Sequence, residues 1–169
     1  MPLSATFRLL LLACLLALSA CGFHLRGVGS VSFQTMYVQD SSAPSIGRDL
    51  KRAIKSSGAK VVDSAEKAQI SLELMSESNE KRILSLSGTG RVREYELLYH
   101  VVFRVRETGS ELWSPPQTVD QRRDFTYNDS QVLAKDNEEA RLNSDMRTDA
   151  IREILRRVSS LSKSNPASE

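Results

Sequence analysis

Residues 94–106 read EYELLYHVVFRVR, and this segment sets the architecture of the chain. Apolar and aromatic side chains recur there at every second position, at Tyr95, Leu97, Tyr99, Val101, Phe103 and Val105. Most positions between them carry charged or polar groups, at Glu94, Glu96, His100, Arg104 and Arg106. Because successive side chains of a strand point to opposite faces, this long alternation predicts a β-sheet with one face on a core and the other in water.

Other segments predict strands that accompany this one. Residues 33–39 contain the apolar run at 36–38 and end at a polar turn, and apolar residues alternate with polar ones in residues 70–75. A last strand is expected at 119–127, with Val119, Gln121, Arg123, Phe125 and Tyr127 at every second position. We expect a brief extended piece at 60–62, which is not counted as a strand. The polar segment 76–90, which ends in Gly-Thr-Gly, predicts a flexible loop.

Two segments predict helices. The first begins at Pro44, carries an apolar stripe and ends before Gly58, where a left-handed cap is favourable. The second is expected to begin near Asp136, with Asp136 as N-cap and Glu139 three residues later as an acidic form of the capping box. Its predicted buried stripe consists of Ile151, Ile154, Leu155, Val158 and Leu161.

The order of these elements, β-α-β-β-β-α, predicts an α+β fold. The simplest arrangement is a two-layer sandwich, with two helices packed on one face of a mixed four-stranded sheet. A right-handed βαβ unit makes the first two strands parallel, and the remaining strands are antiparallel. The polar face of the sheet is left to water or to a partner.

The N-terminus has the order basic, apolar, small, cysteine. Arg8 is followed by an apolar run at 9–18, and Ala20 precedes Cys21. This order predicts a secretory signal whose apolar core is too short to span a bilayer. It resembles a bacterial lipoprotein signal, in which the chain is cut before the cysteine and the cysteine is acylated. The alternative is an ordinary cleavable signal in which Cys21 is incidental.

We therefore expect four parts in the chain. Residues 1–20 are a lipoprotein signal peptide, 21–32 a lipidated flexible lead, 33–161 a single α/β sandwich domain, and 162–169 a disordered tail. Removal of the first 20 of the 169 residues leaves a length that suits one domain with a real core.

Composition excludes several classes of function. The net charge is +2 and falls to +1 when Arg8 leaves with the signal, so nucleic acid is not an expected partner. Only Cys21 remains after cleavage, which excludes a disulfide framework and a thiolate metal site. Gly22 follows the cysteine, and a residue other than Asp there is compatible with export to the outer membrane.

No catalytic, cofactor or metal site can be assembled from the sequence, and we expect a protein that is not an enzyme. The two histidines are His24, close to the lipidated end, and His100, on the polar face of the longest strand. A small lipid-tethered hydrolase that uses His100 is the alternative. Trp113, beside Pro115 and Pro116, is either an anchor for a partner or packing at the sheet edge.

Three short motifs resemble the lipopolysaccharide-assembly lipoproteins of the LptE family. The first is Cys21-Gly22-Phe23-His24-Leu25-Arg26-Gly27, at the lipidation point. The others are residues 93–97, Arg-Glu-Tyr-Glu-Leu, and residues 133–138, Leu-Ala-Lys-Asp-Asn-Glu. Together they bracket nearly the whole mature chain, whose element order agrees with that family's two-helix, four-stranded sandwich.

The resemblance implies a location, partners and a function. The protein would be a lipid-anchored, periplasm-facing component of the outer membrane. It would plug, and help to assemble, a large β-barrel in a one-to-one complex, and it would bind lipopolysaccharide (LPS) during its insertion into the outer leaflet. A lipid-anchored binding module for peptidoglycan or for another barrel assembly machine is the alternative.

The resemblance also implies an LPS-binding site. Lys135 matches the basic residue of the family's Lys-Asp-Asn-Glu stretch, although a solvated loop lysine is the alternative. The family's second basic position falls on Gly88 here, and Arg91 and Arg93 are candidates to replace it. The apolar residues Ile83, Leu84 and Leu86 either contact acyl chains or close over the core.

Overall fold

The computed structural model describes residues 31–164. Its elements in chain order are β1 (Thr35–Gln39), α2 (Pro44–Ser56), β2 (Lys60–Val62), β3 (Ile70–Leu86), β4 (Val92–Glu107), β5 (Gln117–Thr126) and α3 (Val132–Ser164). Short 3₁₀ turns lie at Ala65–Lys67 and Asp129–Gln131. The predicted signal peptide, Cys21 and most of the predicted lead and tail lie outside the described residues.

One mixed sheet runs through the molecule in the strand order β2-β1-β3-β4-β5. β1 pairs in parallel with β2 and with β3, whereas β3–β4 and β4–β5 are antiparallel. The predicted α+β class and the strand directions are confirmed. The sheet has one strand more than the four expected, because residues 60–62 pair with β1 as a fifth strand. This strand was not counted from the sequence because three residues are too few to show an alternating pattern.

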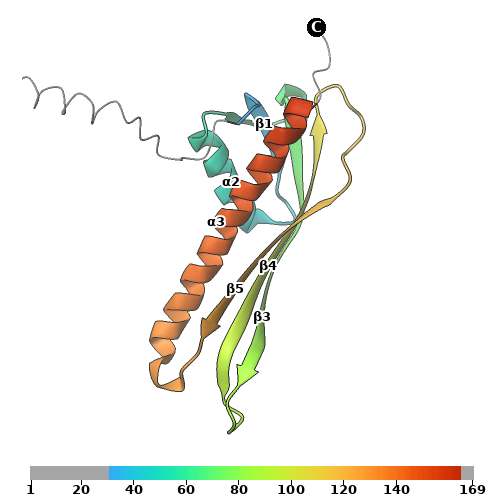
Figure 1. Cartoon of the computed structure of the whole chain (residues 1–169). Coiled ribbons are helices and arrows are strands. Elements are labelled where there is room, and N and C mark those ends of the chain that lie inside the picture. The colour runs from blue at the N-terminus through green and yellow to red at the C-terminus, as the bar shows by residue number, and fades with distance from the viewer. Residues whose placement is uncertain (1–30, 165–169) are drawn as a thin grey trace, which may run out of the picture.

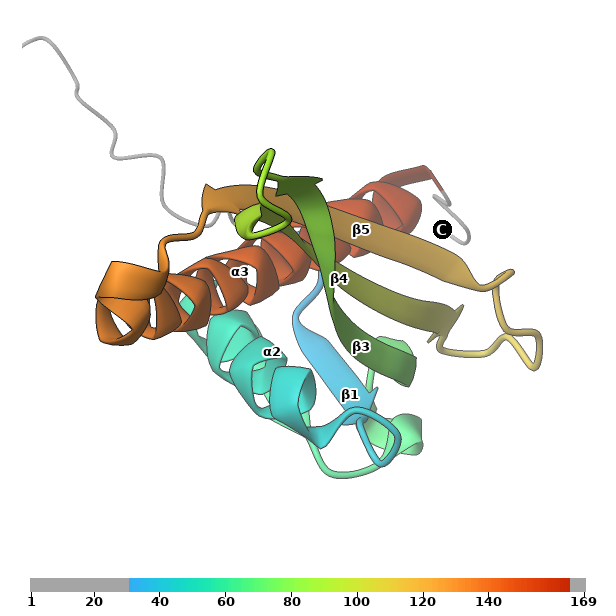
Figure 2. The same ribbon diagram turned by 90° about the horizontal axis from the view of Figure 1, so that it is seen from below.

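Both helices cover the same face of this sheet (Figures 1 and 2). The alternating residues of β4 from Leu97 to Val105 are buried against them, as predicted. The centre of the core also contains Met36, Ile46, Leu50, Ile54, Leu72, Leu74, Met146, Ile154 and Leu155. Leu161, expected in the buried stripe of the last helix, lies instead on the surface.

The flexible loop predicted at 76–90 is wrong, because β3 continues to Leu86 and remains paired with β4 along its whole length. A β-bulge between Leu74 and Ser76 shifts the strand by one residue. The shift reverses the alternation of faces, and it places Glu77 and Lys81 opposite Val101 and Leu97. Because the alternation of apolar and polar residues is interrupted, this polar part of β3 resembles a loop in the sequence.

The predicted start of the last helix is also wrong, because α3 begins at Val132 and Asp136 lies inside it. Asn128 caps the preceding 3₁₀ turn by accepting a 3.0 Å hydrogen bond from the Ser130 N–H. The core contacts of α3 begin at Leu142 and Met146, so residues 132–141 carry no apolar stripe in the sequence. The helix ends at Ser164, beyond the predicted domain boundary at 161.

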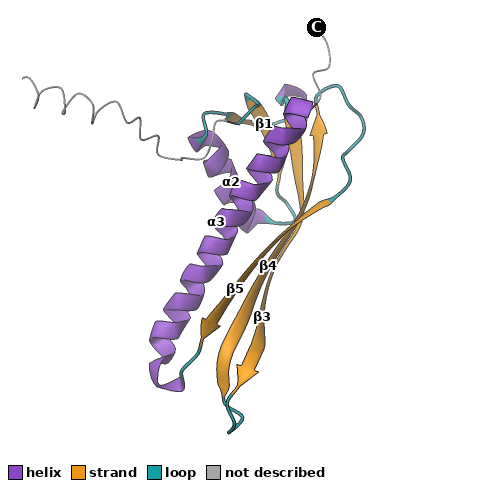
Figure 3. Ribbon diagram, in the orientation of Figure 1, coloured by secondary structure: helices purple, strands orange, loops and turns teal. Residues whose placement is uncertain are grey.

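The molecule is elongated because three strands and α3 extend past the core (Figures 1 and 3). We call residues 76–96, 121–124 and 126–141 the distal arm, and residues 83–93 and 126–135 at its tip the distal end. The chain enters the domain near β1, at the opposite end of the molecule (Figure 1). There Ser32 donates a 2.8 Å hydrogen bond to the carbonyl of Ser159 in α3.

Candidate functional site

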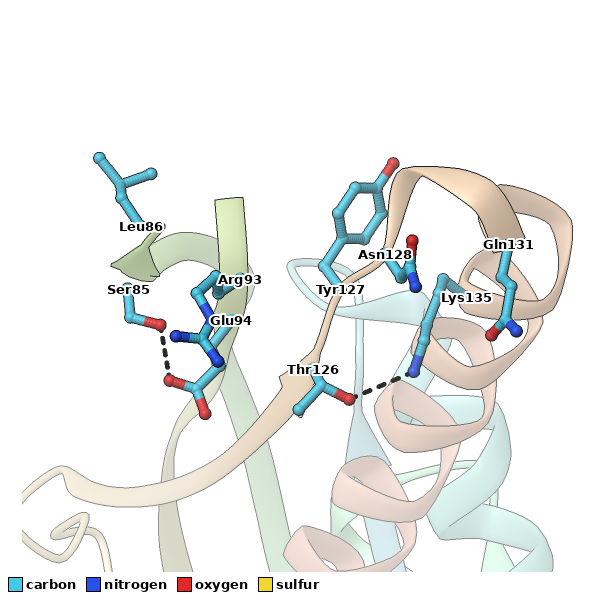
Figure 4. Close-up of a pocket in the computed structure, with 9 residues that line it drawn as sticks. All are labelled: Ser85, Leu86, Arg93, Glu94, Thr126, Tyr127, Asn128, Gln131 and Lys135. Atoms are coloured by element: carbon cyan, nitrogen blue, oxygen red, sulfur yellow. Dashed lines mark hydrogen bonds between the residues drawn. The ribbon is translucent and has the colours of Figure 1, made fainter. Parts of the chain in front are cut away.

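An open pocket of about 550 Å³ lies at the distal end (Figure 4). Its walls come from the end of β3, the start of β4, the segment that follows β5, and the first turn of α3. Lys135 and Arg93, both expected from the sequence, line this pocket together with Leu86 and Tyr127. Arg91 lies two residues before Arg93, at the end of the β3–β4 turn, and does not line the pocket.

Lys135 is held in place and is not a solvated loop lysine. It lies in the first turn of α3, and only 15% of its side chain is exposed. Its Nζ atom is 2.8 Å from Oε2 of Glu138 and 3.4 Å from the Thr126 hydroxyl (Figure 4). The ammonium is thus directed across the pocket toward the last residue of β5.

The two arginines have a different environment. Arg91 and Arg93 are exposed, and within residues 31–164 neither makes an ion pair with a carboxylate. A tight turn orders this part of the hairpin, since the N–H of Gly90 donates a 2.9 Å hydrogen bond to the carbonyl of Ser87. Gly90 has a φ of 77°, a conformation that glycine adopts without strain.

Exposed apolar side chains occur on the same two segments as these cations. Ile83, Leu84 and Leu86 are exposed on the hairpin, so they do not close over the core. Val132 and Leu133 are exposed at the start of α3, and Leu133 is 82% exposed. The sequence did not mark these last two residues as a surface patch, because the helix was expected to begin only near Asp136.

A second cluster beneath the pocket holds α3 against the sheet. The Lys81 ammonium lies 4.3 Å from the centre of the Tyr95 ring and forms an ion pair with Glu139 of α3. Tyr95 stacks on Phe125 at 5.7 Å and meets the edge of Tyr127 at 5.1 Å. These contacts fix the spacing between the two walls of the pocket.

A buried polar network lies where the distal arm meets the core. The Tyr99 hydroxyl donates a 2.7 Å hydrogen bond to Oε1 of Glu77, and the other oxygen of Glu77 accepts a 3.2 Å bond from the N–H of Ile46 in α2. Arg147 of α3 lies 3.4 Å from Glu77 and 3.8 Å from Asp49. Burial and then the hydrogen bond to Glu77 raise the pKa of Tyr99 well above its ordinary value.

The open face of the sheet carries paired charges. His100 lies 2.6 Å from Asp120 across β4 and β5, and Arg104 and Arg122 pair with Glu73 and Glu96. Trp113 packs on this face, with its ring 4.8 Å from the Arg104 guanidinium and 5.0 Å from that of Arg106. The packing interpretation of Trp113 therefore describes its position.

Residues 31–164 contain neither a metal-binding cluster nor a helix suited to crossing a membrane. No group of three or more His, Cys, Asp or Glu side chains there is arranged to hold a metal ion. No helix in that part of the chain combines the length and apolar character needed to cross a membrane.

Comparisons with solved structures agree with the fold. Lipoprotein B from Nitrosomonas europaea is 40% identical, with a TM-score of 0.70 over 84% of this chain and 93% of that one. The rare lipoprotein B from Shewanella oneidensis is 31% identical, with a TM-score of 0.69 over 78% of this chain and 98% of that one.

Sequence comparisons identify the family. The LPS-assembly lipoprotein LptE of Pectobacterium atrosepticum is 31% identical over 156 residues, which cover 90% of this chain and 84% of the relative. The corresponding protein of Photorhabdus laumondii is 28% identical over 153 residues, which cover 89% and 83%. These names describe an assembly lipoprotein, in agreement with the expected non-enzymatic role. Residues 33–158 match the profile of the family LptE, described as lipopolysaccharide-assembly, and the chain therefore belongs to the LptE family of envelope lipoproteins.

Proposed function

We propose that this protein is anchored to the outer membrane through acylated Cys21 and faces the periplasm. There it plugs and helps to assemble the β-barrel that delivers LPS to the outer leaflet, and it binds LPS during that step. Family membership supports the general role in LPS assembly. The barrel partner, the plug and the LPS contact are the parts that we propose.

The observation that carries the LPS contact is the composition of the distal end. Lys135 and Arg93 line the pocket together with the exposed side chain of Leu86. Arg91 lies two residues before Arg93 in the chain, and the exposed Leu133 lies two residues before Lys135. LPS carries phosphates next to acyl chains, so both chemistries of the ligand have a counterpart there. Charge-assisted hydrogen bonds to phosphate are strong, and an exposed apolar patch with a polar rim is typical of a binding surface.

The open sheet face supports the plug. Its residues are charged but paired across strands, as in Arg104 with Glu73 and Arg122 with Glu96. Such a surface suits the polar interior of a wide barrel better than it suits lipid. Because the molecule is elongated (Figure 1), this charged face would be long enough to contact the barrel wall over an extended area.

The test is a mild-detergent pull-down of the tagged, lipidated protein from outer membranes. We expect one large β-barrel in equal stoichiometry, together with LPS. A Cys21→Ser variant is the control for anchoring, and it should be lost from the membrane fraction. Recovery of the protein alone, or with peptidoglycan-associated partners, would contradict the proposal and favour a different envelope-binding module.

A further inference from the structure

The three cations of the distal end are not equally available to a ligand. Arg91 and Arg93 project into solvent without a carboxylate partner in the described part of the chain. Lys135, in contrast, is mostly covered and already paired with Glu138 at 2.8 Å. The most enclosed cation of the pocket is therefore occupied by a group of the protein itself.

We propose that Glu138 is an internal competitor that masks Lys135, and that an anionic phosphate of a lipid headgroup binds in the pocket by displacing this carboxylate. The inference rests on the proposed LPS contact and adds a mode of regulation to it. Ligand capture then has two stages. The exposed arginines attract the headgroup first, and Lys135 exchanges Glu138 for phosphate afterwards.

The helix dipole does not account for Glu138. An acidic residue is stabilised by the dipole within the first turn of a helix. Because α3 begins at Val132, Glu138 lies nearly two turns inside it. Its contact is instead the (i,i+3) pair with Lys135, a residue that lines the pocket.

Exchange of the Glu138 carboxylate for a phosphate costs little free energy. The Glu138 side chain is 43% exposed, so its carboxylate regains water readily once it leaves Lys135. Ion pairs of this kind contribute little to stability, whereas a phosphate brings more charge and more acceptor oxygens. Thr126, at the end of β5, remains to orient the Lys135 ammonium across the pocket (Figure 4).

The experiment measures the affinity of the purified, lipidated protein in detergent for hexaacylated lipid A that carries both phosphates. The Glu138→Gln variant should bind about two- to fivefold more tightly, which is the range that removal of one exposed competing ion pair allows. Glu153→Gln removes the same charge from the other end of α3, where Glu153 pairs with Arg156 and Arg157, and it should leave the affinity unchanged.

A double-mutant cycle assigns the effect to Lys135. In a Lys135→Ala background, the Glu138→Gln change should give no further gain. With lipid A from which the phosphates have been removed, the gain should also disappear. Circular dichroism of each variant checks that the long helix is intact.

The outcomes separate the two proposals. The masking is overturned if wild type binds lipid A and Glu138→Gln binds it no more tightly. It is also overturned if the gain in affinity persists when Lys135 is replaced by alanine. Either result leaves the LPS contact intact. Absence of binding in both proteins overturns the LPS contact itself. If Glu138→Gln binds lipid A and wild type does not, Glu138 masks Lys135 completely.

Discussion

Tyr99 donates a 2.7 Å hydrogen bond to Glu77, and this contact joins the apolar core to the base of the distal arm. Tyr99 is fully buried, and only 10% of the Glu77 side chain is exposed. Glu77 also accepts the N–H of Ile46 in the first turn of α2, a helix whose N-cap residue Ala43 offers no side-chain oxygen. A strand residue thus supplies the missing cap of a helix and fixes the orientation of the arm.

Replacement of Glu77 by alanine should therefore destabilise the fold. The change removes the acceptor for Tyr99 and Ile46 and leaves Arg147 without its nearest carboxylate. We expect a loss of about 2–3 kcal/mol in the free energy of unfolding, measured by urea denaturation. Glu80→Ala, on the exposed part of the same strand, is the matched control and should cost less than about 0.5 kcal/mol. Equal losses in both variants would contradict the role assigned to Glu77.

Stability should also fall in alkaline solution through Tyr99. Burial, and then the bond to Glu77, raise the pKa of Tyr99 in the folded state above its unfolded value of about 10. The folded protein therefore holds this proton more tightly. The associated stability is fully present below about pH 10 and is lost as the pH rises toward the folded pKa. In urea titrations at several pH values, the advantage of wild type over Tyr99→Phe should shrink above pH 10, and a constant difference would contradict this linkage.

How much of the fold the sequence predicts depends on whether a segment lies on the core. Strand β4 could be predicted because Leu97, Tyr99 and Val101 alternate against the helices without interruption. The end of β3 could not, because the bulge after Leu74 reverses the alternation and directs Lys81 inward. The start of α3 was missed because none of residues 132–140 is buried, so the 3.6-residue period of apolar positions is absent.

The site was predictable in part for a similar reason. Lys135 was found through a short motif and Arg93 as a candidate to replace the basic position that falls on Gly88, but neither reason reveals that the two side chains line one pocket. They meet because the start of β4 and the start of α3 lie at the same end of the molecule, which is a property of the folded chain. The pairing of Lys135 with Glu138 depends on the helix starting four residues earlier than predicted.

Gly47 should be intolerant of substitution although it lies in a helix. A Cβ atom built there would overlap with the side chain of Asp40, in the turn that leads into α2. Alanine is ordinarily the better helix former by about 1 kcal/mol, but overpacking of this kind costs about 1–3 kcal/mol. We expect Gly47→Ala to lower the melting temperature. A stabilised Gly47→Ala protein would mean that the Asp40 turn moves without cost.

The exposed cations should control LPS binding without affecting the fold. Arg91→Ala and Arg93→Ala should each weaken binding of purified LPS by about three- to tenfold, because each removes one charge-assisted contact to phosphate. The urea midpoint should not change, since neither guanidinium makes an ion pair in the described part of the chain. Arg48→Ala, an exposed arginine on α2, is the control for bulk charge. Loss of affinity equal to that control would exclude a local role for the two arginines.

The apolar half of the site should respond separately. Leu133 is 82% exposed, so Leu133→Ser removes no core contact and should leave the unfolding free energy within about 0.5 kcal/mol of wild type. Affinity for full-length LPS should nevertheless fall, because the lost side chain no longer covers an acyl chain. Affinity for the water-soluble, deacylated saccharide that keeps the phosphates should remain unchanged. A parallel loss for both ligands would place Leu133 in a structural role.

Gly88 offers a gain-of-function test at the same end. It lies in the turn between Ser87 and Gly90, a Cβ atom built on it meets nothing within 4 Å, and its φ lies outside the left-handed region. Arginine should therefore be accommodated without strain, and it would add a cation at the position where related proteins are expected to carry one. We expect Gly88→Arg to bind LPS about three- to tenfold more tightly at low ionic strength. The gain should decrease as salt is added, because the new charge is exposed. Gly88→Gln has a similar length without the charge, and an equal gain in that variant would show that reach rather than charge limits binding at the distal end.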